Sequence, residues 1–223
     1  MSGVKLIVTS DGSHSLLNEA LNETYHSVHG AIQESQHVFI NNGLYYFLDS
    51  YSPEVVSIFE VGFGTGLNVL LTIKSMQNKK VSVNYTSIEA FPIGEELWSS
   101  LNYTNVLGLS EIFDNVHRCS WEMVNQVLPG FGLNKQRTTL QGIELQPASF
   151  DVVYFDAFAP NKQPELWTID MLAKVYDAMK SKGVFVTYCA KGQLKRDLNN
   201  LGFRVETLAG PPGKKEMVRA VKV

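Results

Sequence analysis

Three glycines and a preceding acid form the first group of residues with the types and spacing needed for chemistry. The stretch Glu60-Val61-Gly62-Phe63-Gly64-Thr65-Gly66 follows an apolar, β-branched run and precedes a helix-like segment. A strand that turns sharply into a helix presents backbone N–H groups and a helix N-terminus at the carboxyl edge of a sheet, where nucleotides bind. Dinucleotide sites use G-x-G-x-x-G, but here Leu67 occupies the position of the third glycine. The G-x-G-x-G spacing, with Glu60 available to meet an ammonium group, instead predicts an S-adenosylmethionine site at Gly62, Gly64 and Gly66. A glycine-rich turn with no ligand remains the alternative.

A second acid, Glu89, ends the next apolar strand, some twenty residues after the glycines. A carboxylate at this register accepts hydrogen bonds from both ribose hydroxyls of a bound nucleoside. We therefore predict that Glu89 binds the cofactor ribose. A solvated acid at a strand end is the alternative.

The third acid, Asp156, follows the strongly apolar strand Val152–Phe155 and begins a loop rich in proline and aromatic residues. Ligands of open α/β sheets bind at this edge, so Asp156 is predicted to border the cofactor and to take part in catalysis. Phe158, Lys162 and Trp167 lie in the same loop and are predicted to contact the substrate. An N-cap acid followed by a packed aromatic loop is the alternative interpretation.

The elements that position these acids alternate between strands and helices. Strands are predicted at 55–60, 81–89, 150–155 and 184–188, with helices at 67–77, about 93–101 and about 168–181. Two further strands, 203–208 and 216–222, are joined too closely for a crossover helix and must form an antiparallel hairpin. The pattern predicts a seven-stranded, mostly parallel α/β sheet with one reversed strand. The final strands of class I Rossmann-like methyltransferases have this arrangement.

The N-terminal third is predicted to be an appendage. Val4–Thr9 alternates weakly and is a candidate strand. Asn41-Asn42-Gly43 separates two apolar runs, which predicts a β-hairpin over 37–47. We therefore divide the chain into an appendage, 1–50, and a Rossmann-like domain, 51–223. Residues 103–148 are harder to interpret, and a hairpin over 137–145 is one possibility.

Composition limits the function classes. The chain has 223 residues, 44% of them hydrophobic, which fits one sizeable α/β domain. No apolar run is long enough to span a bilayer and no secretory signal is visible, so a cytoplasmic protein without membrane contact is expected. The two cysteines and five histidines show no metal-ligand spacing, and no metal is expected. The net charge of −3 means that any nucleic-acid surface must be a local patch.

The segment Phe-Asp-Ala-Phe-Ala-Pro-Asn-Lys-Gln-Pro-Glu-Leu-Trp-Thr, 155–168, closely resembles the signature loop of the methyltransferase domain of the MnmC family. Further similar elements occur in the same order: Glu34 followed by 37–40, the glycine loop through Leu67-Asn68, Glu89-Ala90-Phe91-Pro92, and 213–217. The resemblance covers nearly the whole chain and is weakest over about 100–148. That family also has a Gly-Asp pair that helps hold the adenosine, for which neither 119–120 nor 145–146 is a good equivalent.

The resemblance implies methylation of 5-aminomethyl-(2-thio)uridine at the tRNA wobble position, with S-adenosylmethionine as donor. It implies that Asn68 joins the cofactor site. It also implies contact with the anticodon loop, to which Lys162, Lys191, Lys195, Arg196, Lys214 and Lys215 are candidate phosphate contacts. Phe158 and Trp167 are candidates to stack on the flipped uracil. The family's FAD-dependent oxidase has no counterpart in this sequence, so we expect a stand-alone form that depends on other enzymes for the 5-aminomethyl group. A small-molecule amine methyltransferase and a non-catalytic tRNA-binding protein are the alternatives.

Overall fold

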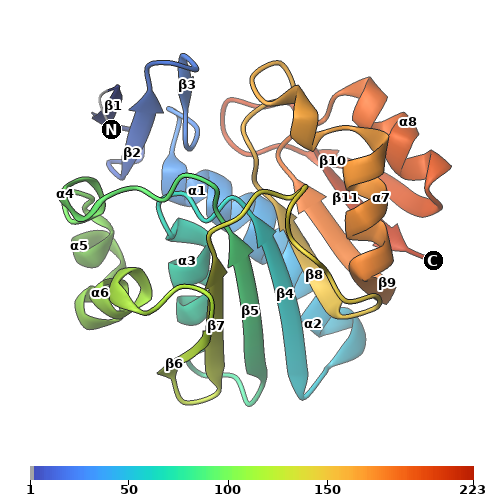
Figure 1. Cartoon of the computed structure of the whole chain (residues 1–223), viewed down its shortest axis with the longest axis horizontal. Coiled ribbons are helices and arrows are strands. Elements are labelled where there is room, and N and C mark those ends of the chain that lie inside the picture. Colours follow the sequence, from blue (N-terminus) through green and yellow to red (C-terminus); the bar gives the residue numbers. More distant parts are fainter. Residues whose placement is uncertain (1–2) are drawn as a thin grey trace.

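A central sheet of eight strands organises the molecule, for which the computed structural model describes residues 3–223. The strand order is β10-β11-β9-β8-β4-β5-β7-β6 (Figure 1). The five inner strands are parallel. They are β4 (Val55–Val61), β5 (Ser82–Ile88), β7 (Phe131–Gln136), β8 (Phe150–Phe155) and β9 (Met179–Thr187). Both faces of these strands are covered, which explains their nearly continuous apolar runs.

The edges of the sheet confirm one prediction and correct another. As predicted, β10 (Phe203–Ala209) and β11 (Glu216–Lys222) form an antiparallel hairpin, and β11 runs opposite to β9. The predicted Rossmann-like sheet is confirmed, but it contains one strand more than the seven expected. Neither β7 nor β6 (Val124–Leu128) has a counterpart among the predicted strand ranges, and β6 pairs antiparallel with β7 as a second reversed strand.

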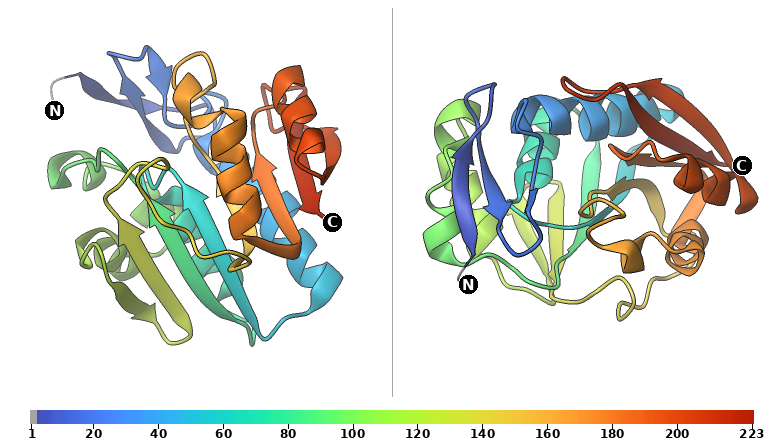
Figure 2. Two further views of the ribbon diagram at one scale, coloured as in Figure 1. Left: turned by 45° about the vertical axis from the view of Figure 1, so that its right-hand side comes forward. Right: turned by 90° about the horizontal axis from the view of Figure 1, so that it is seen from above.

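Helices cover the two faces of the sheet and enclose two apolar clusters (Figure 2). On one face lie α3 (Leu67–Met76) and the helical segment 31–51, with α4 (Glu95–Trp98), α5 (Tyr103–Leu107) and α6 (Ser110–Arg118) toward the β7 edge. On the other face lie α7 (Ile169–Ala178) and α8 (Gly192–Asn200). Helix α8 was not predicted, and α4 is much shorter than the predicted helix 93–101.

The hairpin predicted over 37–47 is wrong. Residues 31–51 form one continuous helical segment made of α1 (Ala31–Ser35), the π-helical η1 (Gln36–Tyr45) and α2 (Tyr46–Tyr51). The Asn42 side chain donates to the backbone oxygen of His37 at 2.8 Å, so a residue typical of turns is accommodated within the helix. Gly43 permits close packing on the sheet, because a Cβ there would lie 2.8 Å from Cγ2 of Val186.

A small antiparallel sheet precedes this helix. Its first strand confirms the candidate strand Val4–Thr9, and its hairpin lies before the one that was predicted. It consists of β1 (Val4–Val8), β2 (His14–Asn18) and β3 (Glu23–Thr24). Figure 1 shows it above the carboxyl edge of the large sheet. The appendage is therefore placed to cover the edge at which the predicted acids end their strands.

The connection from β7 to β8 also differs from the prediction. Residues 137–145 contain no hairpin; the hairpin of this region is β6–β7, and residues 137–149 cross the sheet as a loop. Leu140 is buried in the apolar cluster on the α7 face, with Ile143 and Leu145 packed against it. These three apolar side chains, in an otherwise polar segment, cover this part of the sheet where no helix is present.

Candidate active site

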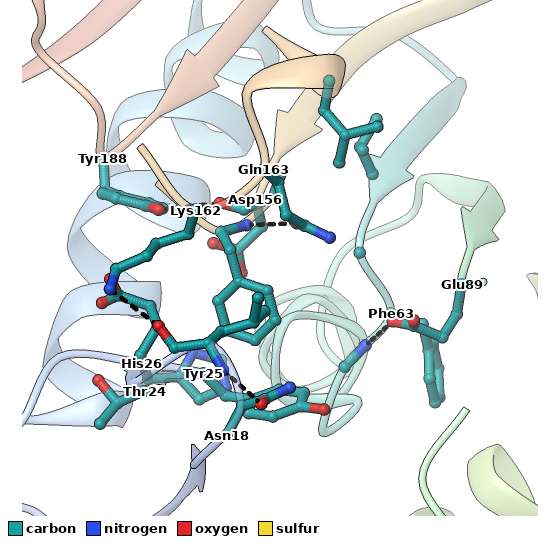
Figure 3. Close-up of a pocket in the computed structure, with 18 of the residues that line it drawn as sticks. Asn18, Thr24, Tyr25, His26, Phe63, Glu89, Asp156, Lys162, Gln163 and Tyr188 are labelled. Atoms are coloured by element: carbon teal, nitrogen blue, oxygen red, sulfur yellow. Dashed lines mark hydrogen bonds between the residues drawn. The ribbon is translucent and has the colours of Figure 1, made fainter. Parts of the chain in front are cut away.

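A cavity of about 870 Å³ lies between the carboxyl edge of the sheet and the appendage (Figure 3). Its size falls within the usual range for small-molecule sites. Its walls come from the glycine loop, the ends of β5 and β8, the loop after β7, residues 18–29 of the appendage, and the turn at 213–214. In Figure 3, Glu89 and Phe63 lie on one side, and Asp156, Lys162 and Tyr188 lie toward the other. The cavity therefore has two ends with different walls.

The glycine loop forms the first wall and is held by backbone hydrogen bonds to the neighbouring strand. The N–H groups of Gly62 and Phe63 both donate to the Ile88 oxygen, at 3.1 and 3.0 Å. Gly62 has φ +95°, and a Cβ there would lie 2.7 Å from the Asp156 backbone oxygen. Helix α3 then begins at Gly66 without a side-chain cap. Its first N–H groups are therefore left for a ligand or water.

Glu89 lies beside this loop, where β5 ends. Its carboxylate accepts hydrogen bonds from the N–H groups of Gly64 at 3.0 Å and Phe91 at 2.9 Å. Burial raises the pKa of Glu89, and these backbone donors oppose the rise. The side chain lines the cavity and is partly exposed to it. Its oxygens keep free lone pairs that can accept from the hydroxyls of a ribose.

Asp156 stands at the end of β8, next to the first turn of α3. Its Oδ2 accepts from Nδ2 of Asn68 at 2.8 Å. Burial, followed by the nearby charge of Glu34, raises the pKa of Asp156 to about 7. The glycine loop and the acid predicted to be catalytic therefore meet at one point, through Asn68.

The opposite end of the cavity is built from side chains that are distant in the sequence. Lys214 forms an ion pair with Glu34, and its Nζ lies 3.8 Å from the ring centre of Tyr188. The Tyr188 hydroxyl donates to the Ala157 oxygen at 2.8 Å. The other Glu34 oxygen accepts from the Ser27 N–H at 2.9 Å. This end thus joins the appendage, α1, the end of β9 and the β10–β11 turn.

The loop after Asp156 packs on the appendage. The Phe158 ring contacts the Tyr25 ring edge to face at 5.1 Å, and Lys162 Nζ donates to the Leu21 oxygen at 2.8 Å. Trp167 is buried against Phe155, and its Nε1–H donates to the Phe158 oxygen at 2.8 Å. The structure therefore places the Trp167 indole in the core, where it holds the loop, while Phe158 and Lys162 line the cavity.

Most of the cofactor and substrate residues predicted from the sequence come together here. Gly62, Gly64, Asn68, Glu89, Asp156, Phe158, Lys162 and Lys214 line the cavity. Gly66 lies behind it, against His117, and Glu60 is fully buried beneath the loop. Lys215 is exposed outside the cavity, as are Lys191 and Arg196, whereas Lys195 pairs with Glu216.

Sequence reasoning missed the residues that support the glycine loop through Thr65. The Thr65 hydroxyl contacts Nε2 of His26 at 2.8 Å and accepts from the Tyr103 hydroxyl at 3.3 Å. His117 Nε2 lies 3.2 Å from the Thr65 backbone oxygen, and its ring stacks on Trp98. Burial lowers the pKa of His26 to about 4 and that of His117 to about 3, so both are neutral at pH 7. No sequence spacing links these residues, because they come from separate elements.

The loop after β7 was also missed. Residues 138–141, Thr-Thr-Leu-Gln, follow the strand next to β5 and line the cavity near Glu89. Their position directly after a strand adjacent to that of Glu89 is the signal that points to them.

Two further searches of the described residues gave negative results. Within residues 3–223, no group of three or more His, Cys, Asp or Glu side chains is arranged to hold a metal ion. None of the helices formed by these residues has the length and apolar character needed to cross a membrane.

The cavity fits S-adenosylmethionine on its own geometry. A Cβ at Gly62 would collide with the backbone, α3 begins uncapped beside Asp156, and the strand-end acid Glu89 lines the cavity. Gly62, Gly64, Asn68 and Glu89 would hold the cofactor. When bound, it supplies an electrophilic methyl group.

Comparison with known proteins agrees with this fit. A family model described as S-adenosyl-L-methionine-dependent methyltransferase matches residues 134–223. A protein from Marinomonas sp. (strain MWYL1) is 27% identical over 210 residues, which cover 87% of this chain and 30% of that protein. One from Burkholderia multivorans is 28% identical, covering 96% of this chain and 34% of the relative. Both are named tRNA 5-methylaminomethyl-2-thiouridine biosynthesis bifunctional protein MnmC. The chain thus spans about a third of the length of these curated relatives.

A solved structure shows the same similarity over the whole chain. The crystal structure of MnmC2 from Aquifex aeolicus superposes with a TM-score of 0.78 at 26% identity, covering 99% of this chain and 70% of that one. The predicted resemblance to the MnmC methyltransferase domain is confirmed. The chain is thus similar to S-adenosyl-L-methionine-dependent methyltransferases in both sequence and fold.

Proposed function

We propose that this enzyme methylates the primary amine of 5-aminomethyl-(2-thio)uridine at the tRNA wobble position, giving 5-methylaminomethyl-(2-thio)uridine. One observation carries the proposal: Asp156 lies at the junction of the glycine-loop cavity and the end lined by Glu34, Lys214 and Tyr188. A group bound at the second end therefore meets the donor next to a carboxylate. The similarity to proteins named for 5-methylaminomethyl-2-thiouridine biosynthesis supports this choice of acceptor.

Asp156 orients the acceptor amine and receives its proton. An alkyl ammonium has a pKa of about 10 in water, and only the neutral amine attacks a methyl group. A carboxylate by itself favours the ammonium, so Asp156 acts mainly by holding the nitrogen in line with the methyl carbon and the sulfur. The raised pKa of Asp156, about 7, reduces the difference in pKa between the ammonium group and the carboxylate that receives its proton.

The substrate base is held by the loop after Asp156. The Phe158 ring is partly exposed to the cavity and is our candidate for stacking on the uracil. Trp167 supports this ring by fixing the Phe158 backbone oxygen. Lys162 and the exposed Lys215 are candidates for contacts with anticodon-loop phosphates. Residues 1–50 act with the domain 51–223 by covering the cavity, and the reaction takes place in the cytoplasm.

A small-molecule amine is the second candidate acceptor, and two observations favour it. The net charge is −3, and Lys195 and Lys214 are paired with glutamates, so fewer cations are available for phosphates. The same position of Asp156 would then orient a free alkyl amine. Other enzymes that install the 5-aminomethyl group are required only under the first proposal.

Labelled S-adenosylmethionine tests the choice between these acceptors. The protein is incubated with the donor and tRNA from cells that lack this modification but carry the 5-aminomethyl precursor, and the tRNA is digested to nucleosides. We expect label in 5-methylaminomethyl-(2-thio)uridine and not in tRNA that lacks the aminomethyl group. Label confined to a small-metabolite fraction would reject the tRNA assignment.

A further inference from the structure

Three buried polar atoms beneath the glycine loop have no partner. Among residues 3–223, Oε1 of Glu60, Oδ1 of Asn68 and the hydroxyl of Tyr85 are buried and make no hydrogen bond. All three side chains lie on the face of the sheet covered by α3. A buried polar group without a partner costs about 1–3 kcal/mol, so three together require an explanation.

The strand register brings these groups into one small region. Glu60 on β4 is aligned with Ser87 on β5 and Tyr154 on β8, and Tyr85 lies two residues before Ser87. Ser87 donates to Oε2 of Glu60 at 2.6 Å. The side chains of Asn68 and Tyr85 lie next to the Glu60 carboxyl group, but its Oε1 makes no hydrogen bond. Glu60 itself is fully buried and does not line the cavity.

The number of hydrogen-bond donors in this cluster indicates the protonation state of Glu60. Asn68 Nδ2 donates to Asp156, and the Asn68 Oδ1 atom is left without a partner. The Tyr85 hydroxyl is the single donor among the three unpartnered atoms, so an ionised Glu60 leaves a conflict: either its own Oε1 or Asn68 Oδ1 has no donor. A single proton on Oε1 removes the conflict, because the O–H donates to Asn68 Oδ1. The Tyr85 hydroxyl can then donate to the same carboxyl group, and every atom of the cluster has a partner.

We propose that Glu60 is held as a neutral carboxylic acid and acts as a positioning residue for Asp156, by donating a hydrogen bond that fixes the Asn68 amide with its Nδ2 toward Asp156. Asn68 is thereby prevented from turning its oxygen toward the Asp156 carboxylate. Glu60 then does not serve as the carboxylate that meets the cofactor ammonium. This inference deepens the proposed function. The protonation state of Glu60 does not depend on that function, whereas the effect of Glu60 on the acceptor amine does.

The surrounding charges favour the neutral form. Burial, with a smaller contribution from the charge of Asp156, raises the pKa of Glu60 to about 8. Tyr85 on β5 and Tyr154 on β8 are buried and neutral, so neither stabilises a carboxylate by its charge. Farther away, Glu34 on α1 and Lys214 in the β10–β11 turn face Asp156 and offset one another as an ion pair. With Glu60 neutral, the negative charge is concentrated on Asp156, beside the acceptor.

Infrared difference spectroscopy on the cofactor-free protein tests the protonation state directly. The spectrum of wild type minus Glu60→Gln at pH 7 is expected to contain the C=O stretch of a protonated acid. This band should convert to carboxylate bands near pH 8. Carboxylate bands alone at pH 6 would overturn the proposal.

Binding of S-adenosylhomocysteine, measured by calorimetry, tests the positioning role. In Glu60→Gln the amide N–H replaces the acid O–H as donor to Asn68, so affinity should stay within about threefold of wild type. Glu89→Gln serves as the control for the loss of a true cofactor carboxylate. A tenfold or greater loss in Glu60→Gln would show that an ionised Glu60 holds the cofactor and would overturn the proposal.

The pH profile of methyl transfer gives the catalytic readout. Glu60→Leu removes the donor and should shift the acidic limb of the profile by about one pH unit, while Glu60→Gln restores the wild-type position. An equal shift in both variants would contradict the role of the donated hydrogen bond. Because the infrared and binding measurements need no acceptor, they remain decisive even if the tRNA assignment fails.

Discussion

The two ends of the cavity are built in different ways. At the Glu89 end, the walls are backbone and strand ends: Gly64 and Phe91 donate their N–H groups to one carboxylate, and Gly62 is tied to β5. At the Lys214 end, the walls are side chains, and the central ion pair joins residues 180 positions apart in the sequence. The first end is therefore a product of local chain geometry, and the second depends on how the whole molecule folds.

This difference suggests that the two ends have separate roles, one in binding the cofactor and the other in binding the acceptor. Under the proposed function, the Glu89 end would recognise the cofactor, and a strand–loop–helix unit is sufficient to build such a site. The Lys214 end would then face the acceptor, and its walls come from the appendage and α1 as well as the sheet. Asp156 lies between the ends and should affect transfer more than binding.

Removing the Asp156 carboxylate, which lies between the two ends of the cavity, should have the largest effect on methyl transfer. Asp156→Ala is expected to lower kcat for methyl transfer by about 10²–10⁴-fold, the usual contribution of a positioned proton acceptor. Affinity for S-adenosylhomocysteine should fall much less, because Glu89 and the glycine loop remain. Single-turnover kinetics and calorimetry separate the two quantities. Transfer at the normal rate would remove Asp156 from the mechanism.

A substitution at Glu89 should weaken cofactor binding and leave the rate of transfer almost unchanged, which is the opposite of the effect expected for Asp156→Ala. Glu89→Gln replaces one acceptor oxygen and is expected to weaken S-adenosylhomocysteine binding about 10–100-fold, or about 1.4–2.7 kcal/mol. The rate of transfer at saturating donor should stay within a few-fold of wild type. Glu96→Gln, on an exposed acid of the same segment, is the matched control. Equal losses in both variants would mean that Glu89 acts only through net charge.

At the Lys214 end, the ion pair should matter for stability. Lys214→Met leaves Glu34 buried without its partner, and we expect a loss of about 1–3 kcal/mol in unfolding free energy, below the range for fully buried pairs because Lys214 is partly exposed. Adding Glu34→Gln should recover part of this loss. Denaturant unfolding of the single and double variants gives the coupling. Additive losses would show that the two charges do not interact.

The smallest expected effect is on the pH dependence of folding stability, to which the buried Glu60 contributes. A raised pKa in the folded state means that stability is present at low pH and lost as pH rises toward that pKa. Glu60, with a pKa of about 8, and Asp156, at about 7, should therefore make stability fall as pH rises from about 5 to 8. His26 and His117 have lowered pKa values and act in the opposite direction below about 6.5.

The window from pH 6.5 to 8 thus isolates the acids. Glu60→Gln should flatten the slope there by at most about 1.4 kcal/mol per pH unit, the value for one proton. Urea unfolding at half-unit pH steps gives the slope, and the comparison of variants cancels the histidine contribution. An unchanged slope in Glu60→Gln would show that Glu60 binds no extra proton in the folded state.

The same contrast explains which parts could be predicted from the sequence. The glycine loop, Glu89 and Asp156 follow apolar strands directly, so their edge of the sheet could be predicted from local pattern alone. The ion pair of Glu34 with Lys214 and the contacts to Thr65 join distant elements, and no spacing reveals them. The incorrect hairpin over 37–47 has a related cause. Asn42 and Gly43 are local turn signals, but packing on Val186 and Tyr154 determined the helix.

The structure of the complex with S-adenosylhomocysteine tests the central claim most directly. We predict the ribose hydroxyls on Glu89, the sulfur facing the side of the cavity that holds Asp156, and Glu60 beneath the loop without contact to the ligand. A ligand bound outside this cavity, or an ammonium group held by the Glu60 carboxylate, would contradict the account.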